Sequence, residues 1–315
     1  MAAPGPETAS PLTGIALKIA SVAVFVAMMT CIKATGPLPP GEIVFFRSAF
    51  AMVPVFAFLA WRRELASGFR TDRPAGHIAR GLVGVTAMAL GFFGLTVLPL
   101  PDAITISYAQ PIVLTILSAI FLGETIRIFR WSAVAAGMLG VLIISWPKLS
   151  LLTGQSEIGQ TEAFGVLAVL GSASLAAVAM ILVRKLIETE TTVSIVVWFS
   201  VTATVASLFT IPFGWEALSA QQTALLIGSG ICGGVAQLLM TQAYRHAPLS
   251  TVAPFDYTSM LLGIAAGYVF FADIPTGQTL FGGSIVVAAG LFIIWREHRL
   301  GIKRKGARRV MSPQG

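Results

Sequence analysis

The sequence predicts an all-α integral membrane protein with ten transmembrane helices, arranged as two inverted-topology repeats of five helices each. Three observations predict this fold class: a composition poor in charge, ten apolar runs long enough to span a bilayer, and a stretch of the first half that recurs in the second. Of the 315 residues, 56% are hydrophobic and only 11% are charged, and the mean hydropathy is +0.83. Soluble domains carry about 25% charged residues, so this chain has too little charge to cover a surface exposed to water.

The apolar runs set the number of crossings. A helix that crosses the ~30 Å hydrocarbon core needs about 20 mainly apolar residues, and the sequence holds ten such runs. Pro and Gly mark most of the connections between them. The runs cover residues 12–32, 42–61, 77–98, 102–122, 131–147, 163–183, 193–213, 223–244, 250–271 and 278–295.

The connections alternate in charge, which predicts the orientation. With ten spans, one side of the membrane holds most of the 21 Lys and Arg residues. The other side holds only Lys33 and Lys148, while Lys18 and Arg47 fall inside or at the edge of spans. The excess of basic residues on the cytoplasmic side of membrane proteins then places both termini in the cytoplasm. The basic tail is expected to contact anionic lipid rather than nucleic acid.

The repeat aligns the two halves at an offset of 149 positions, from Pro99–Glu124 onto Pro248–Asp273. Because five is an odd number of helices, the second copy enters the membrane from the opposite face. The halves are therefore related by a pseudo-two-fold axis in the membrane plane; the alternative is a chance match between apolar segments. The aligned pairs are Pro99 with Pro248, Tyr108 with Tyr257, Glu124 with Asp273, Gly81 with Gly230 and Gly84 with Gly233.

The repeat also predicts the division of the chain. The first repeat covers residues 1–147, an extracytoplasmic linker 148–162, the second repeat 163–296, and a basic cytoplasmic tail 297–315. Gly263 and Gly267 form a GxxxG pair at helix-packing spacing. We expect this pair to pack within one chain, so a monomer is expected, with a dimer left open.

Two segments resemble the drug/metabolite transporter superfamily, in its ten-helix EamA-type branch: GPLPPGEIVFFRSAF after the first helix and PFDYTSMLLGIAAGYVFFADIP near the end. The resemblance implies two EamA-like halves, both termini in the cytoplasm and a central substrate cavity between the halves. Members carry amino acids, other small metabolites, nucleotide-type compounds, vitamins such as riboflavin, or organic cations, often outward. The second acidic position of the pattern is usually Glu; here it is Asp273, which keeps the charge.

Asp256 is the sharpest candidate for chemistry, because ionisable side chains inside spans are costly and mark functional sites. It lies roughly 9 Å along its helix at 1.5 Å per residue. It is a candidate to bind a substrate amine or to carry a coupling proton. The alternative is a carboxylate that an Arg or Tyr of a neighbouring helix holds and that never titrates.

Tyr108 and Tyr257 lie at symmetric depths from opposite faces, where their rings can line a cavity and their hydroxyls can select a polar group. The alternative is that they belong to the aromatic belt at the membrane interface. The amides of Gln110, Gln237 and Gln242 can bond a substrate in the same cavity or join neighbouring helices.

Lys33 and Arg47 flank the outer end of the first two helices, where they can attract a carboxylate. The alternative is that these long side chains reach the interface as anchors, with Glu42 neutralising one of them.

The sequence favours a transporter over an enzyme. Intramembrane enzymes need paired Asp residues, a Ser–His dyad or metal-ligand clusters, whereas this chain has three His, all near span ends or in the tail. A P-loop is absent, so energy would come from a gradient, and no cofactor or metal is predicted. We expect a secondary transporter in the cytoplasmic (inner) membrane that moves small metabolites, amino acids first, by alternating access and preferably outward. The alternatives are an importer of a vitamin, nucleotide-like metabolite or organic cation, or a passive facilitator.

Overall fold

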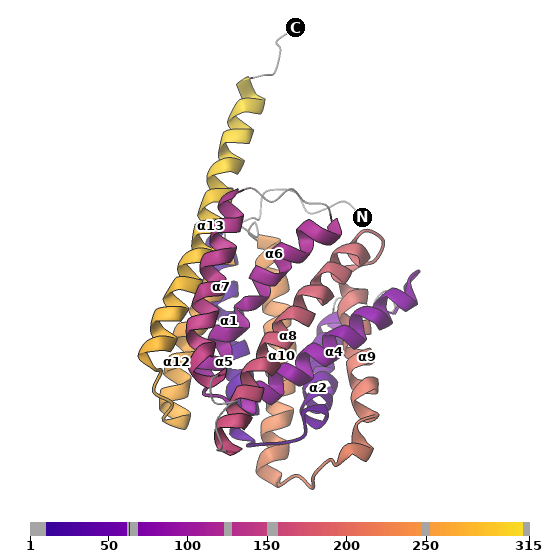
Figure 1. Ribbon diagram of the computed structural model, residues 1–315. Coiled ribbons are helices and arrows are strands. Elements are labelled where there is room, and N and C mark those ends of the chain that lie inside the picture. Colours follow the sequence, from indigo (N-terminus) through magenta and orange to yellow (C-terminus); the bar gives the residue numbers. More distant parts are fainter. Residues whose placement is uncertain are drawn as a thin grey trace.

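The computed structural model describes residues 11–61, 63, 69–122, 128–149, 157–246 and 253–310. All regular structure in these ranges is helical, and the helices form one bundle (Figure 1). The α-helices are α1 Pro11–Ala34, α2 Pro40–Trp61, α4 Pro74–Val97, α5 Leu100–Ser107, α6 Ala109–Leu122, α7 Ile128–Leu149, α8 Glu157–Ile187, α9 Thr192–Leu208, α10 Ala220–His246, α12 Thr258–Phe271 and α13 Gly277–Val310. Two 3₁₀ helices are η3 Ile211–Phe213 and η4 Ala253–Tyr257.

These elements make up the ten predicted crossings. Five of the described helices are long and apolar enough to span a membrane, and α7, α9, α12 and α13 contain shorter apolar stretches. The fourth crossing consists of α5 followed by α6. The five long spans are Leu12–Ala34, Pro40–Trp61, Pro74–Val97, Gln160–Val183 and Ala220–Ala243.

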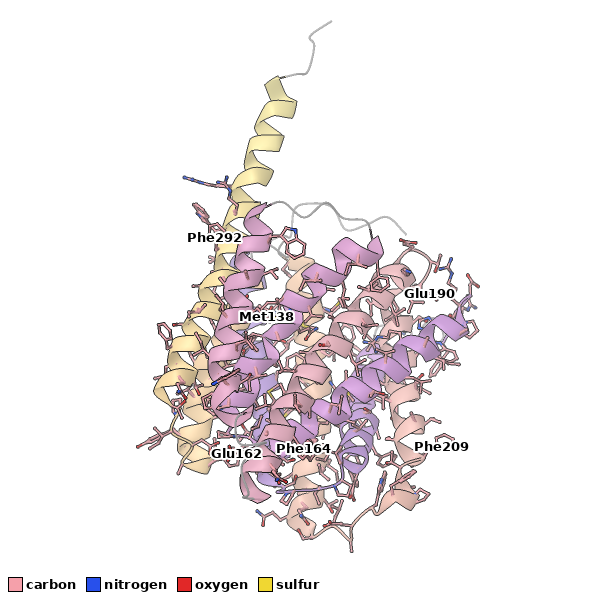
Figure 2. All side chains as sticks on the ribbon, viewed as in Figure 1. Met138, Glu162, Phe164, Glu190, Phe209 and Phe292 are labelled. Atoms are coloured by element: carbon pink, nitrogen blue, oxygen red, sulfur yellow. The ribbon has the colours of Figure 1, made fainter. Side chains whose placement is uncertain are left out.

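Polar and apolar side chains are distributed as lipid contact requires. Lys18, Glu42 and Asp102 are at most 3% exposed, whereas Phe209 is 74% exposed. Phe209 and Phe292 lie on opposite outer edges of the bundle in Figure 2. In a soluble protein, charged side chains are mostly exposed and large aromatic side chains mostly buried. The chain is an integral membrane protein.

Two predicted spans are broken rather than continuous, and each is broken at the tyrosine that the repeat aligns. Helix α5 ends at Ser107 and α6 begins after Tyr108, while η4 ends at Tyr257 and α12 follows it. In the first copy Pro111 accounts for the break. In a regular helix its ring would clash with the carbonyl group four residues earlier, which is that of Ser107. Discontinuous helices of this kind line the substrate sites of inverted-repeat transporters.

The packing confirms the inverted repeat. α2 packs on α9 and α7 on α13, while the pair α1–α10 is mirrored by the pair α8–α4. The glycines that the repeat aligns also have equivalent neighbours. The first helices of the two repeats align at an offset of 152 positions, which places Arg47 on Phe199 and Phe50 on Thr202. The residues that a Cβ atom at each glycine would meet are Thr202 at Gly81, Phe199 at Gly84, Phe50 at Gly230, and Met28 and Arg47 at Gly233.

Small residues let helices approach closely at two further places. A Cβ atom added to Gly140 of α7 would lie 2.6 Å from the carbonyl oxygen of Gly282 of α13, so these backbones are in contact. Gly263 and Gly267 of α12 face Ile104 and Pro101 of α5. The GxxxG pair therefore packs within the chain, as expected.

Some boundaries differ from the sequence prediction. α8 begins at Glu157, inside the stretch predicted as a linker, and α13 continues to Val310 through most of the stretch predicted as a tail. α13 extends beyond the rest of the bundle (Figure 1). Of the aligned repeat positions, Glu124 and Pro248 lie outside the described residues, as do residues 150–156 of the linker.

Candidate functional site

The two aligned tyrosines meet where the repeats face each other. Their ring centroids are 5.2 Å apart at an interplanar angle of 64°, an edge-to-face arrangement. The Tyr108 hydroxyl is 2.5 Å from the hydroxyl of Ser259 in α12, and the Tyr257 hydroxyl lies against the backbone of Gly290 in α13. The equivalent helix breaks of the two repeats are therefore joined directly.

Asp256 is ion-paired with a residue of the first repeat. Its Oδ1 lies 2.6 Å from Nζ of Lys18 in α1. The Lys18 side chain is 1% exposed and the Asp256 side chain 51% exposed, so water reaches the carboxylate but not the ammonium. From the sequence, an Arg or a Tyr was the alternative partner; the partner is instead Lys18, which lies inside the first predicted span.

A cavity of about 310 Å³ lies between the repeats. Its walls come from α1, α4, α5 and α6 of the first repeat and from α8 and α9 of the second. Most of the lining is apolar and includes Met29, Met88 and Phe92 of the first repeat and Met180 of the second. Of the predicted site residues, Gln110 alone is in this lining. The other polar side chains of the lining are Arg80, Ser107 and Ser172.

A second, smaller cavity of about 80 Å³ brings together two arginines. Arg47 of α2 and Arg80 of α4 line it, beside Ser200 and Gln237. The Arg80 guanidinium carbon lies 3.7 Å from the ring centroid of Phe199, a stacked cation–π arrangement. Since Arg80 and Phe199 line both cavities, the two cavities adjoin.

Lys33 lies at a different place and has partners of its own. Its Nζ donates to the Leu98 carbonyl at 2.6 Å and is 3.6 Å from Oδ2 of Asp273. The same carboxylate accepts from the backbone N–H of Leu100 at 3.0 Å. Lys33 thus ties the end of α1 to the α4–α5 and α12–α13 connections, and it lines neither cavity.

Two further expectations have outcomes in the structure. Glu42 does not neutralise Lys33 or Arg47 among the described residues, because its buried carboxylate accepts from the backbone N–H of Glu216 at 3.3 Å. Gln242 also lines neither cavity; its backbone carbonyl is 2.9 Å from Nδ1 of His246.

Outside the spans, Glu190 holds the beginning of α4. It lies in the turn between α8 and α9, at the edge of the bundle (Figure 2). Its Oε1 accepts from the Thr71 hydroxyl and from the backbone N–H groups of Asp72 and Arg73 at 2.9–3.0 Å, and its Oε2 is 3.5 Å from Nε2 of His77. Desolvation raises the pKa of Glu190, but these hydrogen bonds outweigh it and leave the pKa below its usual value.

Sequence reasoning missed Lys18, Arg80 and Phe199. Arg80 follows Pro74 by six residues and so lies about 9 Å inside α4. Phe199 could have been found from the repeat, because the offset of 152 positions places it at the same helix position as Arg47, which was a predicted site residue.

Two inverted repeats with a cavity at their interface are typical of transporters. The sequence profile of the EamA-like transporter family matches residues 12–146 and 163–296, one match for each repeat. The chain belongs to this family and is a transporter rather than an enzyme.

Several named relatives are similar over most of the chain. The S-adenosylmethionine uptake transporter of Rickettsia felis is 27% identical over 82% of this chain and 84% of its own length. The pseudopaline exporter CntI of Pseudomonas aeruginosa is 28% identical over 88% and 94%. The riboflavin transporter of Rhizobium johnstonii is 29% identical over 83% of both chains.

One crystal structure matches the fold with a TM-score of 0.64, covering 92% of this chain and 99% of the other at 18% identity. At that identity the match supports the fold alone. It covers both repeats, in agreement with the architecture described above.

Proposed function

We propose that the protein is a secondary carrier that moves a small organic solute across the cytoplasmic (inner) membrane by alternating access. The observation that carries this proposal is the cavity of about 310 Å³ between the repeats, lined by side chains of both. Binding sites for small molecules have volumes of roughly 300–1,000 Å³ and mostly apolar walls with a few polar groups. A solute that contacts both repeats can favour one of their two arrangements over the other.

Amino acids are the proposed substrate class, and export is the proposed direction. An amino acid would place its carboxylate toward the arginines and its apolar side chain among the methionines. The riboflavin-transporting relatives support a vitamin as the second candidate. The relatives include both an uptake transporter and an exporter.

The proposed orientation follows from the charges of the connections, with both termini in the cytoplasm. In this orientation the Lys33–Asp273 contact lies on the extracytoplasmic side. It joins α1 to the second repeat there, so we expect it to separate when the cavity opens outward. The division into repeats at residues 1–147 and 163–296, with a tail at 297–315, completes the proposed organisation.

Asp256 is the proposed carrier of a coupling proton. Its carboxylate is accessible to water and paired with Lys18 of the other repeat, so protonation would weaken a contact between the repeats. The outcome that opposes this role is an Asp256→Asn variant whose transport keeps the pH dependence of the wild type.

Counterflow into liposomes tests the carrier itself. Purified protein is reconstituted into liposomes that contain one unlabelled compound, and uptake of the same compound in labelled form is followed, for amino acids, riboflavin and a quaternary ammonium compound in turn. Saturable exchange of one class, absent from protein-free liposomes, supports a carrier. Non-saturable conductance supports a facilitator or channel instead, and exchange of riboflavin alone would replace the amino-acid assignment.

A further inference from the structure

The small cavity holds two guanidinium groups whose charges have no counter-ion in the structure. Among the residues that the structure describes, neither Arg47 nor Arg80 lies in an ion pair with a carboxylate. Nε of Arg47 and Nε and Nη1 of Arg80 are buried and meet no hydrogen-bond partner there. Buried charges in proteins are ordinarily paired, and buried N–H groups bonded, because leaving either unsatisfied costs several kcal/mol.

The surrounding helices are built to keep these groups in place. Gly233 of α10 leaves the space that the Arg47 guanidinium fills: a Cβ atom there would lie 3.2 Å from Nε. Gly84, one turn after Arg80 on α4, leaves the space for the Phe199 ring, 2.8 Å from its own hypothetical Cβ. Phe199 in turn stacks on the Arg80 guanidinium and fixes its plane. The two arginines of the first repeat are therefore held in place by the space that Gly84 and Gly233 leave and by the ring of Phe199.

From this arrangement we infer that Arg47 and Arg80 form a subsite for the oxyanion group, a carboxylate or a phosphate, of the transported solute. The inference rests on the proposed carrier function and names the chemistry of its substrate. Guanidinium forks match both oxyanions in geometry and charge. Bringing an anion between the two groups removes their mutual repulsion and satisfies the buried N–H donors at the same time.

The adjoining cavity determines what the rest of the solute looks like. Because Arg80 and Phe199 line both cavities, an anion held in the small one can continue directly into the larger one. The larger cavity presents Met29, Met88 and Met180, whose flexible and polarisable side chains accept irregular apolar shapes. The substrate class is thus a small organic solute that carries an oxyanion group, as an amino acid does, on an apolar or aromatic body, and Gln110 and Ser172 are available to its polar substituents.

Matched probes of one shape test the inference in the wild-type protein. The probes are 3-phenylpropionate, 2-phenylethyl phosphate, the neutral 3-phenylpropanamide and the cationic 3-phenylpropylamine. Binding to the full chain is measured by calorimetry in a neutral detergent and again in zwitterionic nanodiscs, with and without added phosphatidylglycerol. The expected result is that at least one anion binds at least tenfold more tightly than the amide and the amine. Equal affinity for acid and amide would overturn the inference, and displacement of the anions by phosphatidylglycerol alone would assign the subsite to a lipid headgroup.

Variants then assign the selectivity to the two arginines. Arg47→Gln and Arg80→Gln are each expected to weaken anion binding at least tenfold, because a charge-assisted hydrogen bond is lost. Arg73→Gln, at an exposed arginine of the same region, is the matched control and should bind as the wild type does. Wild-type affinity for the anions in both Gln variants would contradict the inference. Should either variant fail to fold, the comparison of acid with amide in the wild type still decides.

The counterflow assay separates this inference from the carrier proposal. If the protein exchanges only neutral or cationic solutes and Arg47→Gln leaves that exchange unchanged, the carrier proposal stands and the anion subsite is wrong. If no solute is exchanged while anion binding depends on the arginines, the subsite stands and the carrier proposal is wrong.

Discussion

The ion pair between Lys18 and Asp256 connects α1 to the helix break of the second repeat, and Asp256→Asn removes its negative charge. The Lys18 ammonium is 1% exposed, so this change leaves a buried cation with less compensation. Breaking a fully buried ion pair costs about 3–5 kcal/mol. Asp256 is 51% exposed, and water already screens part of the attraction. We therefore expect a loss of about 2 kcal/mol, below the fully buried range.

Thermal unfolding of the purified protein, followed by tryptophan fluorescence, measures this loss. For chains of 150–250 residues 1 kcal/mol shifts the unfolding midpoint by about 2–4 °C, so for this longer chain the decrease is at most about 4–8 °C. Asp72→Asn, at an exposed carboxylate, is the matched control and should unfold at the wild-type temperature.

A double-mutant cycle shows whether the effect comes from the pair. Lys18→Met removes the buried charge, and combining it with Asp256→Asn should cost clearly less than the sum of the two single changes, with a coupling energy above about 1 kcal/mol. Additive effects of the two substitutions would refute the reasoning, since the residues would then contribute to stability independently.

Three other predictions concern different parts of the bundle. The hydrogen bonds that lower the pKa of Glu190 stabilise the fold above the usual glutamate pKa of 4.5, and this contribution is lost as the pH falls through the lowered value; Glu190→Gln should therefore unfold earlier than wild type at pH 7, with the gap closing toward pH 4, and a gap independent of pH would argue against the ionised contact. Gly140→Ala should destabilise by about 1–3 kcal/mol because the new methyl group meets the backbone of α13, whereas Gly228→Ala, with nothing within 4 Å, should be neutral or stabilise by up to about 1 kcal/mol; equal unfolding midpoints would exclude the close α7–α13 contact. Tyr108→Phe deletes the hydroxyl bonded to Ser259 and should cost about 1 kcal/mol, while an unchanged midpoint in chemical or thermal unfolding would show that this contact between repeats is not stabilising.

Hydropathy and repetition determined the fold class, the ten crossings and the inverted repeat. These features are encoded locally: an apolar run either is or is not long enough to cross the bilayer, and an aligned Pro, Tyr or Gly is visible in the chain itself. The same alignment predicted that Tyr108 and Tyr257 would occupy equivalent positions, and the structure places both at helix breaks.

The structure brings some of the predicted site residues together and leaves others apart. Tyr108, Tyr257 and Asp256 lie together, and Arg47, Gln237 and Gln110 line the two adjoining cavities. Lys33 and Gln242 lie elsewhere, and both were placed in the site because polar side chains within spans look alike in a sequence.

Only the tertiary structure decided which of these groups become partners. Lys18 and Asp256 are distant in the sequence, and so are Arg80 and Phe199. Hydropathy reports how deep a residue lies along its own helix, but it contains no information on the rotation of that helix or on the neighbour it faces. Those are set by ridges, grooves and glycine contacts between helices. They separate a paired lysine such as Lys18 from an arginine such as Arg80, which has no ion-pair partner among the described residues.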